Sequence, residues 1–196
     1  MNLGFIGTGN IVSDIVTGIS KSDFSYKKII ISPKNKKKAK NLKKKFKKVM
    51  IAKDNQSVID KSDWVFLGVL PQVGEDILPK LNFKKKQIII SFMSTTNYLK
   101  LKKLIKIKAT IIRAIPMPPI RFGRGPVAIF PPNQKIKNFF NKIGTTIEIK
   151  NEKLSKNFWA ISGTMASFYE LLNVLSNWLI RKKINKSDAQ KYVTSL

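Results

Sequence analysis

Short apolar runs alternate with segments of helical length through the first 115 residues of this chain. Alternation of this kind, with runs that are apolar on both faces, is typical of a mostly parallel sheet covered by helices on both sides. We therefore expect an α/β, Rossmann-type, doubly wound fold. The predicted strands are 3–6, 28–32, 49–52, 64–69, 88–91 and 110–115, and the predicted helices are a segment from Asn10, 36–46, 73–81 and 98–105.

The composition changes after Pro116, where a stretch rich in Pro and Gly predicts irregular backbone. Short strands over 127–130 and 146–149 and a helix near 135–143 should follow. From Leu154 the chain reads as helical, with Ser187 as the cap of a last helix. We expect two domains: a nucleotide-binding domain over 1–151 and a helical segment over 152–196, a partial dimerisation domain that looks incomplete.

Residues 158–180 carry a single charge, Glu170. The run is long enough to span a bilayer, but it holds too many polar groups for lipid, so we expect no membrane span. A helix apolar nearly all round is buried in protein. The rest of the chain offers too little surface to cover it, so we expect a homodimer formed through 158–196.

The composition excludes several kinds of chemistry. The chain has no cysteine and no histidine, and its 11 carboxylates are scattered, so we predict no metal site. The net charge of +27 comes almost entirely from lysines spread along the chain, which indicates solvated faces rather than a specific nucleic-acid site. No signal peptide is evident at the start, so we expect a cytoplasmic protein.

The stretch GFIGTGNIV, residues 4–12, lies where the first strand should meet the first helix. That is the context in which a glycine pair binds a dinucleotide. Gly7 would permit the tight turn, and Gly9 would let a diphosphate approach the amides of Asn10 and Ile11 at the head of the helix. Gly7, Thr8, Gly9, Asn10 and Ile11 are thus the predicted phosphate-binding residues. The alternative is a structural turn without a ligand, and Val12 replaces the third glycine of the pattern.

The end of the second strand favours NADP over NAD. An acid there would hold the ribose of NAD, but no acid occurs between Asp23 and Asp54. Ser32, Lys34 and Asn35 instead offer a hydroxyl, an ammonium and an amide to a 2′-phosphate. NAD, with these residues as an ordinary lysine-rich loop, is the alternative.

Two further segments should line the cofactor, since ligands bind at the carboxyl ends of parallel strands. Asn55, after the third strand, is positioned for the adenosine ribose. Val69, Leu70 and Pro71 end the fourth strand. Both segments could equally be turn chemistry.

Four stretches in order resemble the pyrroline-5-carboxylate reductase family across essentially the whole chain. The opening GFIGTGNIV resembles the family's GFIGTGNM, and residues 63–72, DWVFLGVLPQ, resemble D-hh-FLAVKPQ. Residues 113–119, RAIPMPP, resemble R-V-MPNTP, with a Gly-rich turn over 123–125. Residues 162–168, SGTMASF, resemble SGSGPAY at the start of the family's long helix.

The resemblance implies an NAD(P)H-dependent oxidoreductase that reduces the C=N bond of a small cyclic imine to give proline. The substrate side would then include Met117, Ser162, Gly163 and Thr164. Ser162 and Thr164 are the nearest candidates for a catalytic proton donor, with helix capping and packing as the alternative; the catalytic residue itself is not identified.

The chain departs from the family in its substrate half. Met117 replaces the asparagine near the nicotinamide, Pro118 the threonine and Leu70 the lysine, and the chain stops at Leu196 before the family's Gly-Gly-Thr segment. Two alternatives therefore stay open. One is an NADP-dependent oxidoreductase with a different imine or carbonyl substrate, and the other is a catalytically weak dinucleotide-binding protein.

Overall fold

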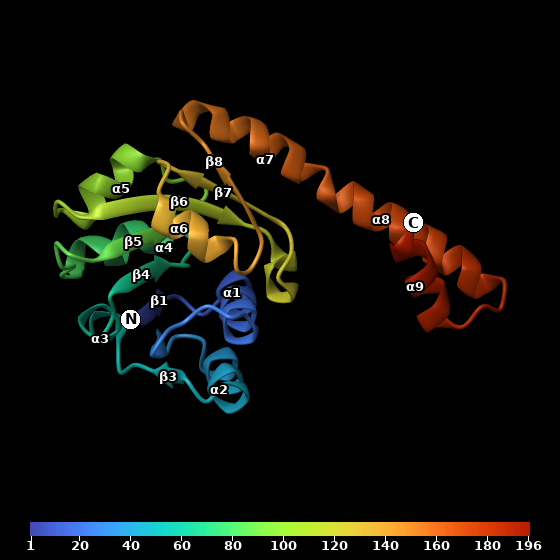
Figure 1. Cartoon of the computed structure of the whole chain (residues 1–196), viewed down its shortest axis with the longest axis horizontal. Coiled ribbons are helices and arrows are strands. Elements are labelled where there is room, and N and C mark those ends of the chain that lie inside the picture. Colours follow the sequence, from blue (N-terminus) through green and yellow to red (C-terminus); the bar gives the residue numbers. More distant parts are fainter. The chain divides into compact units, whose positions relative to one another are not determined.

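Eight strands form one sheet in the order β3-β2-β1-β4-β5-β6-β7-β8 (Figure 1). Strands β1 to β6 are all parallel, β7 is antiparallel to β6, and β8 is parallel to β7. The prediction of a Rossmann-type, mostly parallel sheet is confirmed. The strands are β1 (Asn2–Ile6), β2 (Lys28–Ile31), β3 (Val49–Ile51), β4 (Trp64–Leu67), β5 (Ile88–Ser91), β6 (Thr110–Pro116), β7 (Pro126–Phe130) and β8 (Thr145–Glu148).

This computed structural model describes the backbone of residues 1–196 and every side chain except that of Trp159. The chain divides into two compact units, Met1–Glu152 and Lys153–Leu196. The first unit contains the sheet, and the second contains helices.

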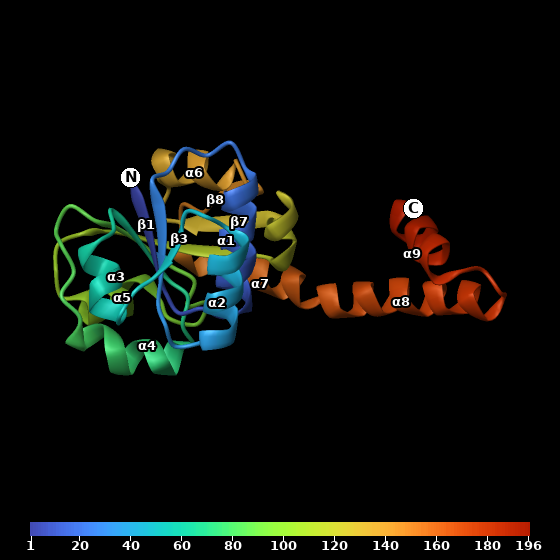
Figure 2. The same ribbon diagram turned by 90° about the horizontal axis from the view of Figure 1, so that it is seen from below.

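Helices cover both faces of the sheet, because the strands are apolar on both sides (Figures 1 and 2). On one face a buried cluster joins β1 and β4 to α1 (Asn10–Lys21), α2 (Lys36–Lys45), the short 3₁₀ helix η2 (Pro118–Phe122) and α6 (Gln134–Phe140). Here Phe5 stacks on Phe66 with ring centroids 4.5 Å apart, and Phe66 packs on Phe139 at 5.5 Å. The other face is covered by α3 (Asn55–Asp60), α4 (Pro71–Ile77), the 3₁₀ helix η1 (Leu78–Lys80) and α5 (Tyr98–Ile105).

Side-chain caps define where several helices begin. A carboxylate or amide oxygen at the N-cap accepts a backbone N–H of the first turn, which satisfies one of the donors left open there. The residues that do this are Asn35, Asp54, Asn97, Asn133 and Asn185. Helix α3, which the apolar pattern does not predict, begins at such a cap.

The second unit differs from the sequence prediction in two respects. The single long helix expected over 158–180 is interrupted at Thr164, giving α7 (Ser155–Gly163), preceded by the 3₁₀ turn η3 (Glu152–Leu154), and α8 (Met165–Arg181). Ser187 does not cap α9 (Lys186–Ser195): the cap is Asn185, whose side chain accepts the Asp188 N–H at 2.9 Å. Among the residues described, no helix is long and apolar enough to cross a bilayer.

Candidate dinucleotide-binding site

Strands β1 and β4 are neighbours at the centre of the sheet, with β2 and β3 beyond one and β5 and β6 beyond the other. This is the point where the strand order reverses, and doubly wound sheets bind ligands there, outside the carboxyl ends of the strands. The turn between β1 and α1 lies at this edge. It contains Gly7, Thr8 and Gly9.

Gly7 is required by the backbone itself. Its φ of +96° lies in the region that only glycine adopts without strain. A Cβ atom here would also lie 2.4 Å from the carbonyl oxygen of Gly68, at the end of β4. Gly7 therefore makes the tight turn that its sequence context predicts.

At Gly9, neither the backbone conformation nor a close protein contact requires glycine. It is the N-cap of α1 with an extended backbone, and a Cβ atom built on it would meet nothing within 4 Å in the described structure. Nor does any described side chain cap this helix. The first amides of a helix have no intrahelical partner and carry its positive dipole end. The space in front of the Asn10 and Ile11 amides thus fits a diphosphate, and a side chain at Gly9 would enter that space.

A contact between α1 and the residue after β4 explains the missing third glycine. Val12 is fully buried, and a Cβ atom on Gly68 would lie 2.1 Å from its Cγ2 atom. Glycine at the end of β4 therefore accommodates the valine that stands on α1. The close packing of α1 on β4 is preserved, because the small residue lies at the end of the strand and not on the helix.

Ser32 and Thr8 face inward and brace the turn. Ser32 is fully buried, and its hydroxyl oxygen accepts the Gly7 N–H at 2.9 Å. The Thr8 hydroxyl, also buried, donates to the Ser32 carbonyl oxygen at 2.7 Å. Both side chains thus hold the turn in shape rather than facing a ligand.

The residues after β2 are arranged differently from Ser32. Lys34 and Asn35 are exposed, and the Asn35 side chain caps α2 by accepting the Lys38 N–H at 3.2 Å. The ammonium of Lys38 donates to the side-chain oxygen of Asn10, the first residue of α1. A lysine that the sequence does not single out therefore lies at the head of this helix.

The other predicted cofactor residues lie along the same edge. Asn55 is the first residue of α3 and is half-buried; the carboxylate of Asp54 before it accepts the Ser57 N–H at 2.7 Å, which holds the pKa of Asp54 below its usual value. Val69 is half-buried, whereas Leu70 is 70% exposed. Pro71 is the first residue of α4, where its fixed φ suits a helix start.

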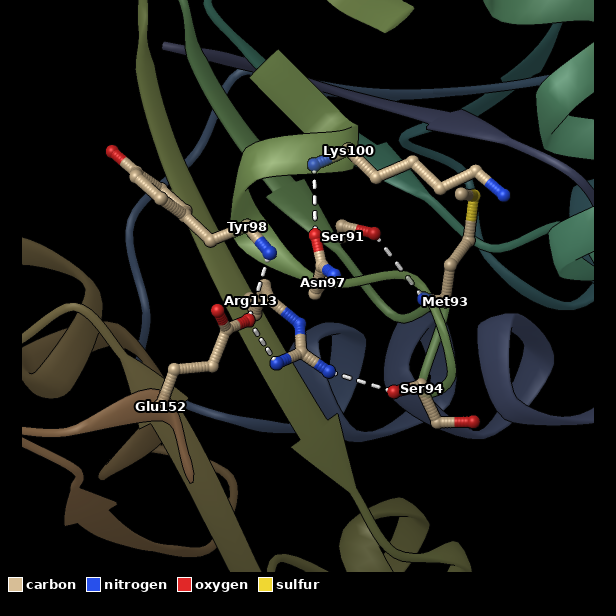
Figure 3. Close-up of polar contacts among 8 residues, drawn as sticks. All are labelled: Ser91, Met93, Ser94, Asn97, Tyr98, Lys100, Arg113 and Glu152. Atoms are coloured by element: carbon tan, nitrogen blue, oxygen red, sulfur yellow. Dashed lines mark hydrogen bonds and ion pairs between the residues drawn. The ribbon is translucent and has the colours of Figure 1, made fainter. Parts of the chain in front are cut away.

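A buried arginine braces the loop after β5 (Figure 3). Arg113, on β6, is 4% exposed; it pairs with the Glu152 carboxylate and donates to the carbonyl oxygen of Ser94 at 2.7 Å. The same Glu152 oxygen accepts the N–H of Tyr98 at 2.7 Å. Glu152 was not identified from the sequence, because no local pattern links it to a strand residue 39 positions earlier.

The predicted substrate-side residues fall in both units. Met117 is half-buried and directly precedes η2, after the carboxyl end of β6. Ser162, Gly163 and Thr164 lie at the junction of α7 and α8, where the Ser162 hydroxyl donates to the Phe158 carbonyl and that of Thr164 to the Ile161 carbonyl. Across the described residues, no three acidic side chains lie together as metal ligands would.

Comparisons with known proteins agree with this architecture. Residues 2–95 match a family model described as NADP oxidoreductase coenzyme F420-dependent. The chain is 26% identical to pyrroline-5-carboxylate reductase of Haemophilus influenzae, covering 97% of this chain and 73% of that protein. It is 24% identical to the enzyme of Vibrio alginolyticus, covering 97% and 74%.

Solved structures show the same relationship. The 1-pyrroline-5-carboxylate reductase of Streptococcus pyogenes superposes with a TM-score of 0.82 at 25% identity, covering all of this chain and 76% of that one. The Plasmodium falciparum enzyme, solved with NADP bound, has a TM-score of 0.83, and the match covers all of this chain and 75% of that one; at 20% identity it supports the fold alone. Together these comparisons confirm the resemblance to the pyrroline-5-carboxylate reductase family that the four motifs indicate.

Proposed function

We propose that this protein is an NADP-dependent oxidoreductase that reduces the C=N bond of a small cyclic imine, as in the last step of proline biosynthesis. The observation that carries the proposal is the open space at Gly9, in front of amides that no described side chain caps. The similarity to pyrroline-5-carboxylate reductases over 97% of the chain supplies the substrate class.

The chain's own residues would bind and orient the coenzyme. The Asn10 and Ile11 amides would bind the diphosphate, Gly7 and Ser32 would hold the turn in place, and the exposed Lys34 and Asn35 would meet the 2′-phosphate. When bound, NADPH supplies a hydride for the imine carbon, and a proton delivered to nitrogen completes the amine. The protein needs mainly to position the two partners, so the absence of histidine is no obstacle.

A second candidate is reduction of a different imine or of a carbonyl compound. Leu70 is 70% exposed at the predicted cofactor edge, where the family pattern has lysine, and Met117 replaces an asparagine. Both changes remove polar groups from the substrate side. NADPH oxidation with another imine or a ketone, but not with pyrroline-5-carboxylate, would favour this candidate; tight binding with no turnover of any of them would indicate a binding protein.

We extend the proposal to a homodimer formed through residues 158–196. Four side chains of α8 lie at helical spacing and are 40–54% exposed in the single chain: Phe168, Leu171, Leu175 and Trp178. A stripe of large apolar side chains of this kind marks a protein interface. A second copy presenting the same stripe would cover it with two-fold symmetry.

The phosphate site is tested with two glycine variants. Gly9→Val should keep the fold, because a Cβ atom at this position meets no protein atom within 4 Å, but it should abolish NADPH binding measured by calorimetry. Gly7→Ala is the contrast: at φ +96° and 2.4 Å from a carbonyl oxygen it should lower the melting temperature of the protein. Retained NADPH affinity in a folded Gly9→Val protein would refute the site.

A further inference from the structure

One lysine of α2 differs from its neighbours. The helix contains seven lysines. Six of them are exposed, whereas Lys38 is half-buried between α2 and α1. Burial of a lysine costs free energy unless its ammonium finds partners. Lys38 therefore has a defined position, while the other lysines extend into solvent.

The partners of Lys38 place it at the head of α1. Its ammonium donates to the side-chain oxygen of Asn10, whose backbone amide belongs to the first turn of that helix. Asp14 lies one turn further along the same helix, and Lys38 acts on its carboxylate electrostatically. Arg121, from η2, approaches the Asp14 carboxylate at 3.5 Å.

A cavity of about 460 Å³ opens beside these groups, between α1, α2 and η2. Its lining includes Asn10, Asp14, Lys38 and Arg121. Burial raises the pKa of Asp14, and the charges of Arg121 and Lys38 act in the opposite direction. The Lys38 side chain therefore borders an open space beside the head of α1.

We propose that Lys38 is a phosphate-binding residue of the coenzyme site, contacting the same phosphate oxygens as the amides at the head of α1. The proposal rests on the function proposed above. An ammonium has three donors, and Asn10 uses one of them. A phosphate in front of Asn10 would offer Lys38 a charged acceptor in place of a neutral amide oxygen, and such bonds are the stronger ones.

Asp14 opposes this contact. Its carboxylate attracts the Lys38 ammonium along α1, and its negative charge lies one turn from the phosphate site. Arg121 offsets part of that charge from η2. Removing the Asp14 charge should therefore strengthen phosphate binding, whereas removing the Lys38 charge should weaken it. Opposite effects from two neighbouring residues distinguish an electrostatic contact from a general disturbance of the helices.

The experiment compares Lys38→Gln with Lys40→Gln. Lys40 stands on the same helix, about 200° further round, is exposed, and loses the same charge. We expect Lys38→Gln to raise the dissociation constant for NADPH about tenfold and to reduce the dependence of that constant on salt, while Lys40→Gln behaves as the unmodified protein. Asp14→Asn should lower the constant about threefold. Melting temperatures should stay equal among the three variants.

Comparing NADH with NADPH shows whether Lys38 contacts the diphosphate, which both coenzymes carry, or the 2′-phosphate, which only NADPH carries. We expect Lys38→Gln to weaken both coenzymes equally, which assigns Lys38 to the diphosphate; a loss confined to NADPH would overturn that assignment and place Lys38 at the 2′-phosphate instead. Equal affinities in Lys38→Gln and Lys40→Gln would overturn the inference and leave the proposed function intact. Failure of the unmodified protein to bind either coenzyme would overturn the proposed function itself.

Discussion

The contact between Val12 and Gly68 predicts a strong energetic coupling between α1 and the end of β4. The family pattern has alanine at the position of Gly68. In Gly68→Ala, the new Cβ atom would lie 2.1 Å from the Val12 Cγ2 atom. That distance is far inside van der Waals contact, so helix and strand must move apart. Overpacking of this kind costs about 1–3 kcal/mol of unfolding free energy.

Val12→Ala perturbs the same contact from the other side. Val12 is fully buried, so removing two methyl groups forfeits about 1.6 kcal/mol of burial plus the cost of the cavity they leave. In the double variant, the methyl group added at position 68 enters the space that the valine vacates. The double variant should therefore be more stable than Gly68→Ala alone.

The assay is a double-mutant cycle in urea, with all four proteins at one concentration because association would otherwise shift the midpoints. The expected signature is a coupling of at least about 1 kcal/mol with an unchanged dependence of free energy on urea. Additive effects of the two substitutions would refute the reasoning, because they would show that positions 68 and 12 do not compete for the same space.

Three further predictions use other contacts. Arg113→Ala should lower the free energy of unfolding by about 3 kcal/mol, seen as a lower urea midpoint, because Glu152 loses its buried partner; Arg113→Lys should rescue little, since one ammonium cannot reproduce the fork that holds Glu152 and Ser94. The amide that Asp54 caps lowers the pKa of this carboxylate in the folded protein. The carboxylate therefore stabilises the fold at pH values above its ordinary pKa of 3.8, and this contribution is lost as the pH falls through the lower folded pKa. Asp54→Asn should remove that part of the pH dependence of the melting temperature. Leu171→Glu should convert the proposed dimer to monomer in analytical ultracentrifugation, and an unmodified protein that is already a stable monomer would contradict the dimer.

The central strands could be predicted because they are short apolar runs, rich in β-branched and aromatic residues, that are buried on both faces. The run 88–91 is an example: it is too short for a helix, and its consecutive isoleucines fix both its type and its place inside the sheet. The turn between β1 and α1 could be predicted for a similar reason, since the positive φ of Gly7 is a conformation that favours glycine.

Other features depend on contacts that no local pattern records. Helix α3 has only Val58 and Ile59 on its buried side, too few to produce a visible period. Ser187 and Asn185 are both residue types that cap helices well, and the structure shows that Asn185 is the cap while Ser187 lies in the first turn. The partner of Arg113 lies 39 residues away, and Gly68, which makes room for Val12 of α1, follows the distant strand β4.

The inward orientation of Ser32 separates two tasks within four consecutive residues. Its hydroxyl is committed to the Gly7 amide and fixes the shape of the turn, whereas Lys34 and Asn35 are exposed to solvent and take no part in that bond. Lys34 can therefore be exchanged without disturbing the turn, whereas Asn35 also caps α2. Under the proposed contact with the 2′-phosphate, a change of coenzyme preference should begin at Lys34 and leave both Ser32 and the capping Asn35 untouched.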